Sequence, residues 1–102
     1  MSTSSFIGYV GDPDFHDGSI LSVEQQEGMA RVRVRGASGK HFRVDFNGVG
    51  AVRANRPVGM VLYALSEMGA LPPMRRFVFA NWDERSDADL EVDAASFVVH
   101  EE

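Results

Sequence analysis

Residues 30–46, ARVRVRGASGKHFRVDF, decide the fold prediction. Apolar residues alternate with charged or polar residues on both sides of a segment with two glycines. An alternation with a period of two is typical of a strand that buries one face. A three-residue loop at 37–39 lets both apolar sets face the same side, and it places Gly39 where a type I turn with a bulge needs a left-handed residue. The stretch is therefore predicted to be a β-hairpin.

The loop also fixes the hairpin register, with Gly36 opposite Lys40. Directly opposed residues then fall into a buried set and an outer set. The buried pairs are Val34 with Phe42, Val32 with Val44, and Ala30 with Phe46; the outer pairs are Arg35 with His41, Arg33 with Arg43, and Arg31 with Asp45. We therefore expect four arginines and a histidine on one exposed sheet face.

The flanking segments extend this pattern. Residues 1–18, rich in Gly, Pro, Ser and Asp, predict an irregular lead-in, with 1–14 as a partly irregular arm and 6–10 as a candidate short strand. Residues 19–25 and 75–82 predict two further strands. Residues 88–99 predict a last strand in which the alternation slips by one residue near Ala94, as a bulge or bend would require.

Residues 58–68 are predicted to be helical. The apolar residues Val58, Val61, Leu62, Leu65 and Met68 recur at steps of three and four, which is the pattern of an amphipathic helix. Pro57 precedes this run and Gly69 follows it, both in favourable places for helix ends. A buried strand over residues 60–65 is the alternative, because short apolar runs fit both structures.

The sequence as a whole predicts one α+β domain over residues 1–102. Its core would be a twisted antiparallel sheet of about five strands with one inserted helix, and a partial barrel is the alternative form of that sheet. The length of 102 residues suits a single domain. A composition of 44% hydrophobic and 25% charged residues is that of an ordinary globular protein.

Charge and cysteine content exclude several classes. The net charge of -5 disfavours a protein held to nucleic acid or to anionic lipid by bulk charge. The absence of cysteine excludes disulfide scaffolds, thiolate nucleophiles and cysteine-ligated zinc. Neither a signal peptide nor a membrane-spanning run is recognisable, so the expected location is the cytoplasm. No cofactor is predicted.

The charges are unevenly distributed along the chain. Residues 29–57 hold seven basic residues and one acidic residue, a local charge of +6, whereas residues 81–102 hold one strong base and eight acids, a local charge of -7. The outer residues Arg31, Arg33, Arg35, His41 and Arg43 could therefore bind an acidic partner. The alternative is neutralisation by the acids at 87, 89, 91 and 93, within the fold or in a second copy. Nucleic acid ranks last, because Phe42 and Phe46 point away from this face and leave no stacking platform.

A second candidate site lies in residues 12–18, DPDFHDG, where three carboxylates and an imidazole fall within seven residues. The spacing does not match a calcium loop, and a second nearby histidine for a transition metal is lacking, so no metal ligands are predicted. Two interpretations remain. The first is a structural loop in which Gly18 supplies an unusual backbone angle and Phe15 anchors the arm in the core. The second is a pocket near His16, Asp17 and Trp82. No catalytic residues are predicted, because none of the nearby serines lies in a nucleophile motif.

Residues 15–20, FHDGSI, and residues 42–49, FRVDFNGV, carry a resemblance to a group of small bacterial domains. Those domains have a His-Asp-Gly or His-Asp-Ala opening ahead of a β-meander, and some resemble immunity proteins that neutralise secreted toxins by binding them. The similarity covers residues 15–48 and a closing strand over residues 90–99, while residues 55–73 have no counterpart in the group. The resemblance implies binding rather than catalysis, and it carries over no active-site residues.

The predicted function is therefore a small non-enzymatic protein-interaction domain that binds another protein, or a second copy of itself, through its basic sheet face. A small-ligand or enzymatic pocket near His16, Asp17 and Trp82 is the alternative. Nucleic-acid contact through the basic hairpin is a further alternative.

Overall fold

The predicted hairpin is present with the predicted register. The computed structural model describes residues 5–102, and in it β3 (Met29–Arg35) pairs with β4 (His41–Asn47) so that Val32 lies opposite Val44. The other five pairs derived from the loop length are also confirmed. Gly39 has a φ of 94°, which is the left-handed conformation expected at that position of the loop.

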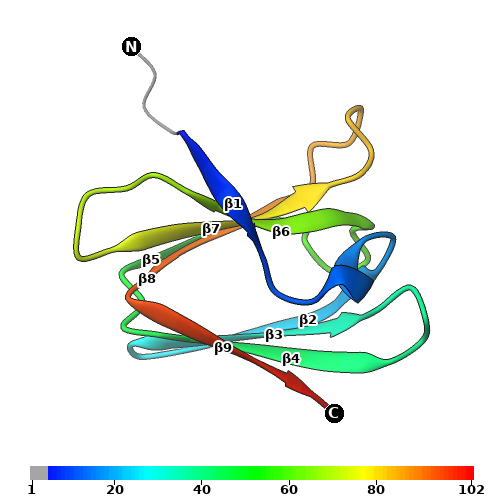
Figure 1. The fold of residues 1–102 in the computed structure, drawn as a ribbon, viewed down its shortest axis with the longest axis horizontal. Helices are drawn as coiled ribbons and strands as arrows, with labels where there is room; N and C mark the ends of the chain where they lie inside the picture. The colour runs from blue at the N-terminus through cyan, green and yellow to red at the C-terminus, as the bar shows by residue number, and fades with distance from the viewer. Residues whose placement is uncertain (1–4) are drawn as a thin grey trace.

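Two antiparallel sheets face each other across one core, and the described residues contain no α-helix (Figure 1). The remaining elements are β1 (Phe6–Val10), a short 3-10 turn η1 (Pro13–Phe15), β2 (Ser19–Gln26), β5 (Ala51–Asn55), β6 (Leu62–Met68), β7 (Arg75–Asn81), β8 (Asp89–Ala94) and β9 (Ser96–Glu101). One sheet has the order β1-β6-β7-β8-β5, and the other has the order β2-β3-β4-β9. The α+β prediction is therefore wrong: the chain forms a β-sandwich, neither a single sheet with a helix nor a partial barrel.

The core lies between the two sheets and is built from inward-facing residues of both. Phe46 of β4 is fully buried, and its ring lies 5.3 Å from that of Phe77 and 6.0 Å from that of Phe79, both in β7 of the opposite sheet. Val32 and Phe42 are also buried, as the alternation predicts. Burial of this apolar surface from both layers is the main force that holds the sandwich together.

The predicted helix over 58–68 is wrong, and a β-bulge explains why its spacing misleads. Leu62 and Leu65 are both fully buried although they are three residues apart. In a regular strand such residues would face opposite sides, but the register of β6 against β7 shifts between Leu62 and Ala64. The bulge inserts one extra residue and returns Leu65 to the core. A bulged strand therefore reproduces the three-residue step of a helix.

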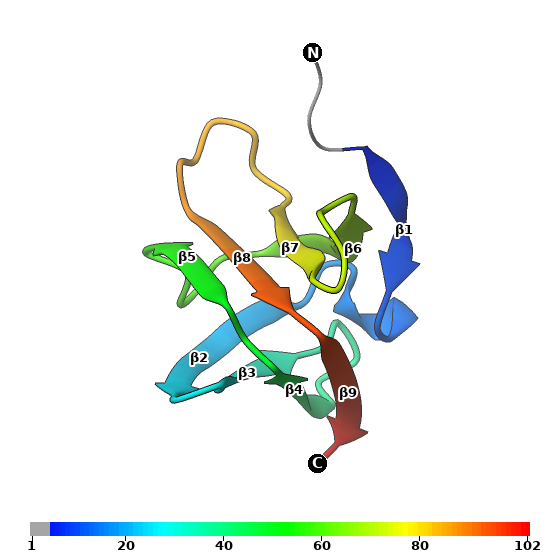
Figure 2. The same cartoon turned by 90° about the vertical axis from the view of Figure 1, so that its left-hand side faces the viewer.

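The last two strands confirm the predicted slip. β8 belongs to the five-stranded sheet and ends at Ala94, while β9 begins at Ser96 in the four-stranded sheet. The chain changes sheets at Ala95, whose N–H donates to the Asn47 carbonyl at 3.0 Å. Figure 2 shows this crossing as one continuous path from β8 into β9. The one-residue slip in the apolar alternation thus marks the point where the chain leaves one sheet and enters the other.

The N-terminal arm is more regular than predicted. Residues 6–10 form β1 at an edge of the five-stranded sheet, and η1 follows it, while the part of the predicted arm over residues 1–4 lies outside the described residues. Phe15 is buried and packs edge-on against Phe42, so it anchors the arm as predicted. The unusual backbone angle belongs to Asp17, with φ 66°, rather than to Gly18. Gly18 is needed for a different reason, because a Cβ there would lie 2.5 Å from the Arg35 carbonyl oxygen.

Candidate binding surfaces

The first candidate surface is the outer face of the four-stranded sheet, where the predicted residues lie together. We call Arg31, Arg33, Arg35, His41 and Arg43 the arginine face. Because Val32, Val34 and Val44 fill the core side of the same strands, strand alternation turns these five side chains outward. The prediction that these five residues share one outer sheet face is therefore confirmed.

The arginine face carries its own counter-charges. The Asp45 carboxylate accepts hydrogen bonds from Arg31 Nε at 2.8 Å and Arg43 Nε at 3.2 Å. Partial burial alone would raise the pKa of Asp45, but the two arginines outweigh it, and the net effect lowers that pKa. Glu24 lies 2.9 Å from Arg33, and Glu102 lies between Arg33 and Arg43 at 3.5 and 3.8 Å. The opposed like charges of Arg33 and Arg43 are thus neutralised locally.

The acids that supply this neutralisation are not the ones the sequence suggested. The acids of β8 lie in the other sheet, where Asp93 pairs with Arg53 and Arg76, each at 2.9 Å. Asp87 pairs with Arg56 in the same region of the molecule. Hydrogen bonds from Arg76 lower the pKa of Asp93, burial opposes them, and Arg53 adds to the lowering. The strands that flank the hairpin are β2 and β9, so Glu24 of β2 and Glu102, which follows β9, reach the arginines instead.

The second candidate surface is a chain of aromatic rings at the opposite sheet. We call Phe6, Tyr9, His16, Tyr63 and Trp82 the aromatic patch. Ring centroids are 4.9 Å apart for Phe6 and Tyr9, 6.0 Å for Tyr9 and Tyr63, and 5.8 Å for Tyr63 and Trp82. The last two rings are stacked at only 9°. Such pair geometries are attractive beyond the area they bury.

Four separate segments position the aromatic patch: β1, the turn after η1, β6 and the residue after β7. The Nδ1–H of His16 donates to the Tyr63 carbonyl at 2.9 Å, and its ring lies edge-on to both Tyr63 and Trp82. The backbone N–H of Trp82 donates to the Val61 carbonyl at 2.9 Å, which fixes the end of β7 against the start of β6. Hydrogen bonding with Tyr63 raises the pKa of Tyr9.

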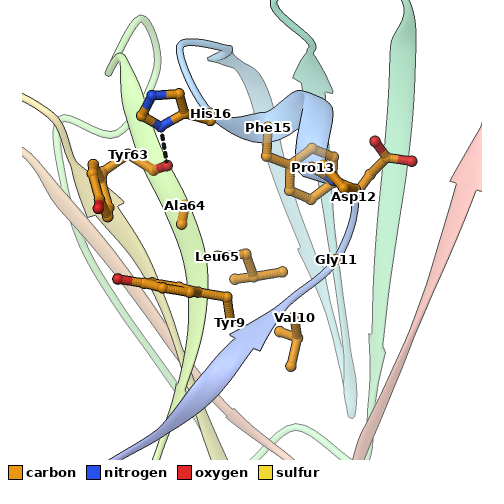
Figure 3. Close-up of a pocket in the computed structure, with 10 residues that line it drawn as sticks. All are labelled: Tyr9, Val10, Gly11, Asp12, Pro13, Phe15, His16, Tyr63, Ala64 and Leu65. Atoms are coloured by element: carbon orange, nitrogen blue, oxygen red, sulfur yellow. Dashed lines mark hydrogen bonds between the residues drawn. The ribbon is translucent and has the colours of Figure 1, made fainter.

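A pocket of about 340 Å³ opens beside the aromatic patch, between β1, η1 and β6. Figure 3 shows Val10, Phe15 and Leu65 toward the interior, while the Tyr9 and Tyr63 rings extend to the same side of β6. This volume is at the small end of the range for ligand pockets. The pocket could hold a small apolar group or one side chain of a partner.

The structure brings the three predicted pocket residues together only in part. His16 lines the pocket, and Asp17 lies beside it, with its carboxylate 3.8 Å from His16 Nε2. Trp82 contacts the His16 ring at 5.9 Å but lines a neighbouring hollow. Tyr9, which fell in the arm, and Tyr63 were not among the predicted pocket residues. The helix prediction places Tyr63 on the outer side of the helix, at an edge that faces solvent or a partner. A strand assignment for 60–65 would have turned Tyr63 outward beside the Trp82 strand.

The polar side chains that line the pocket are those of Tyr9, Asp12, His16 and Tyr63. The ten described residues that line it include no serine, threonine or lysine that could act as a nucleophile beside His16. Over residues 5–102, no three His, Cys, Asp or Glu side chains gather closely enough to hold a metal ion.

The same part of the chain contains no helix with the length and hydrophobicity that a membrane crossing requires.

Comparison with protein-family models gives no match for this chain, and neither the curated proteins nor the solved structures contain a significant match to it.

Proposed function

We propose that this chain is a small non-enzymatic protein-interaction domain and that its main contact surface is the aromatic patch. One observation carries the proposal: the rings of Phe6, Tyr9, Tyr63 and Trp82 lie next to one another in a row, yet each of the four residues is between 39% and 61% exposed. Contiguous exposed apolar surface marks interaction sites on folded proteins. Tyrosine and tryptophan are also enriched among the few residues that carry most of the binding energy at protein interfaces.

The arrangement of the rings favours binding for a second reason. Tyr63 is held by its stack with Trp82 and by the edge-on contact of His16. Side chains that are already ordered lose less conformational entropy when a partner covers them. The aromatic patch therefore offers a preorganised surface to another protein or to a second copy of this chain. Residues 15–48 resemble a group of small bacterial domains, some of which are similar to toxin-binding immunity proteins, and this resemblance also favours a binding role.

The arginine face is the second candidate contact surface. Within residues 5–102, Arg35 has no carboxylate within 4.0 Å, so its charge is available to an acidic partner. The face as a whole offers less, because its four arginines lie among the carboxylates of Glu24, Asp45 and Glu102, a net charge of +1. Long-range attraction of an acidic surface by so small an excess is weak. For this reason we rank the arginine face below the aromatic patch.

The experiment compares two double variants in affinity capture from cells that express the chain. Tyr63→Ser/Trp82→Ser removes the stacked pair, and Arg33→Glu/Arg43→Glu reverses two charges of the arginine face. We expect the first variant to lose the proteins captured by the wild type and the second to retain them. Circular dichroism confirms that both variants fold, and sedimentation tests self-association in parallel.

Equal capture and equal self-association by the wild type and the Tyr63→Ser/Trp82→Ser variant would overturn the proposal. Loss in the arginine variant alone would move the interaction to the arginine face. A melting temperature that rises with a small molecule, and no longer rises after His16→Ala, would favour the pocket as a ligand site instead.

A further inference from the structure

A hollow of about 260 Å³ lies next to the stacked rings of the aromatic patch. Tyr63, Ala80, Asn81, Trp82 and Glu84 line it, and we call it the Trp82 hollow. The turn that follows β7 forms its rim and projects beyond the sheet at the upper right of Figure 1. The hollow thus combines two aromatic rings with one carboxylate.

Hydrogen bonds within the turn hold the rim in place. The Asp83 N–H donates to Asn81 Oδ1 at 2.8 Å, and the Arg85 N–H donates to Asp83 Oδ1 at 3.0 Å. The Asn81 side-chain amide donates to the Ala88 carbonyl at 3.0 Å. The side chains of Asn81 and Asp83 are therefore engaged within the turn.

The Glu84 carboxylate, in contrast, takes part in no hydrogen bond or ion pair over residues 5–102, so it is available to a ligand.

The surroundings of the stacked rings are negatively charged. Asp12 lines the pocket on the His16 side, Asp17 lies beside His16, and Asp83 and Glu84 form the rim on the other side. Arg85 is the one strong base on that rim, so these five residues carry a net charge of -3. The faces of aromatic rings also attract cations, most strongly those of tryptophan. The rings and the carboxylates therefore select the same kind of ligand, a cation.

We infer that the Trp82 hollow binds an arginine side chain of the protein partner. The inference rests on the proposed function and names the group that the aromatic patch recognises. A guanidinium is planar, so it stacks on an indole or phenol ring while its edge N–H groups reach a carboxylate such as Glu84. An ammonium group gives a point charge without the stack, and a quaternary ammonium cannot donate to Glu84. The paired features of the hollow thus favour arginine over other cations.

Trp82 is the only tryptophan of the chain, so its fluorescence reports directly on this site. The probes are three short peptides of the form Gly-X-Gly with blocked ends, in which X is arginine, lysine or citrulline, a neutral analogue of arginine. All titrations are made at the same ionic strength. We expect a saturable change in Trp82 emission with the arginine peptide, and binding of the citrulline peptide weaker by about fivefold or more.

Variants at Glu84 and Glu27 distinguish a direct contact between Glu84 and the peptide from an effect of the protein's overall charge on binding. Glu84→Gln should weaken binding of the arginine peptide by about two- to fivefold, because an exposed ion pair rarely contributes more binding free energy than this factor represents. Glu27→Gln makes the same change of charge in the turn between β2 and β3. That turn lies at the opposite end of β2 from Ser19, which bridges Val61 near the hollow, so no effect is expected there.

Equal binding of the arginine and citrulline peptides, no binding of either, or equal losses in the two glutamine variants would overturn the inference. The failure of the proposed function looks different. If the Tyr63→Ser/Trp82→Ser variant loses its captured partner but the arginine peptide does not bind, the inference fails and the proposed function stands. If the arginine peptide does not bind and the Tyr63→Ser/Trp82→Ser variant keeps its captured partner, the inference and the proposed function both fail.

Discussion

Replacing Glu67 by glutamine should measurably destabilise the fold at neutral pH. The Glu67 carboxylate accepts two hydrogen bonds from Arg75, at 2.9 Å to Nε and 2.8 Å to Nη2, and its side chain is only 12% exposed. The Arg75 guanidinium lies over the rings of Phe77 and Phe97, at 5.1 and 5.6 Å. Phe77 belongs to one sheet and Phe97 to the other, so the Arg75 side chain that Glu67 holds in place contacts both sheets.

The magnitude follows from this geometry. Hydrogen bonds to charged groups contribute about 1.5–3 kcal/mol when solvent is excluded. The Arg75 side chain is 40% exposed, so its contribution is reduced by solvent screening, and we expect Glu67→Gln to cost about 1–2 kcal/mol. For a chain of this size, that corresponds to a fall in melting temperature of about 4–12 °C.

The pH dependence gives a second readout. Hydrogen bonds from Arg75 lower the pKa of Glu67, while desolvation opposes them. A carboxyl group whose pKa is lower in the folded state stabilises the fold fully above its unfolded value of about 4.3. That contribution disappears as the pH falls through the folded value. The difference between wild type and Glu67→Gln should therefore shrink as the pH is lowered below about 4.

The assay is urea unfolding followed by circular dichroism, from pH 7 down to pH 3. Glu24→Gln is the matched control, because it also removes one carboxylate from an arginine but in an exposed pair on the arginine face. It should change stability by about 0–1 kcal/mol. The reasoning is refuted if Glu67→Gln is as stable as the wild type at pH 7, or if its deficit is unchanged at pH 3.

Two further predictions concern the N-terminal third of the chain. Gly18→Ala should destabilise the fold, because its Cβ would lie 2.5 Å from a backbone oxygen. Gly8→Ala should be nearly neutral, because among residues 5–102 no heavy atom beyond the two chain neighbours lies within 4 Å of a Cβ at that position. Equal melting temperatures for the two variants would contradict this expectation. Ile7→Lys should reduce self-association at high concentration without lowering the melting temperature, because β1 is an exposed sheet edge with no charged residue and lysine disfavours edge-to-edge pairing. Unchanged light scattering would count against that expectation.

The sequence by itself determined the central hairpin and the crossing at the end of the chain. The alternation in residues 30–46 and the position of Gly39 were enough to give every pair between β3 and β4, including the outward direction of the arginines. The parity change near Ala94 likewise located the point where β8 becomes β9. Both features depend on neighbouring residues, because strand alternation and turn conformation act over a few positions.

Tertiary structure alone decided the rest. The bulge in β6 arises from pairing with β7, and without that pairing the spacing of Leu62 and Leu65 fits a helix equally well. The aromatic patch joins residues from four separate segments, from Phe6 to Trp82, and no short-range pattern connects them. The counter-charges of the arginine face also depend on which strand lies beside β4. Contacts between distant segments are selected by the packing of the whole core, which is why local sequence patterns do not contain them.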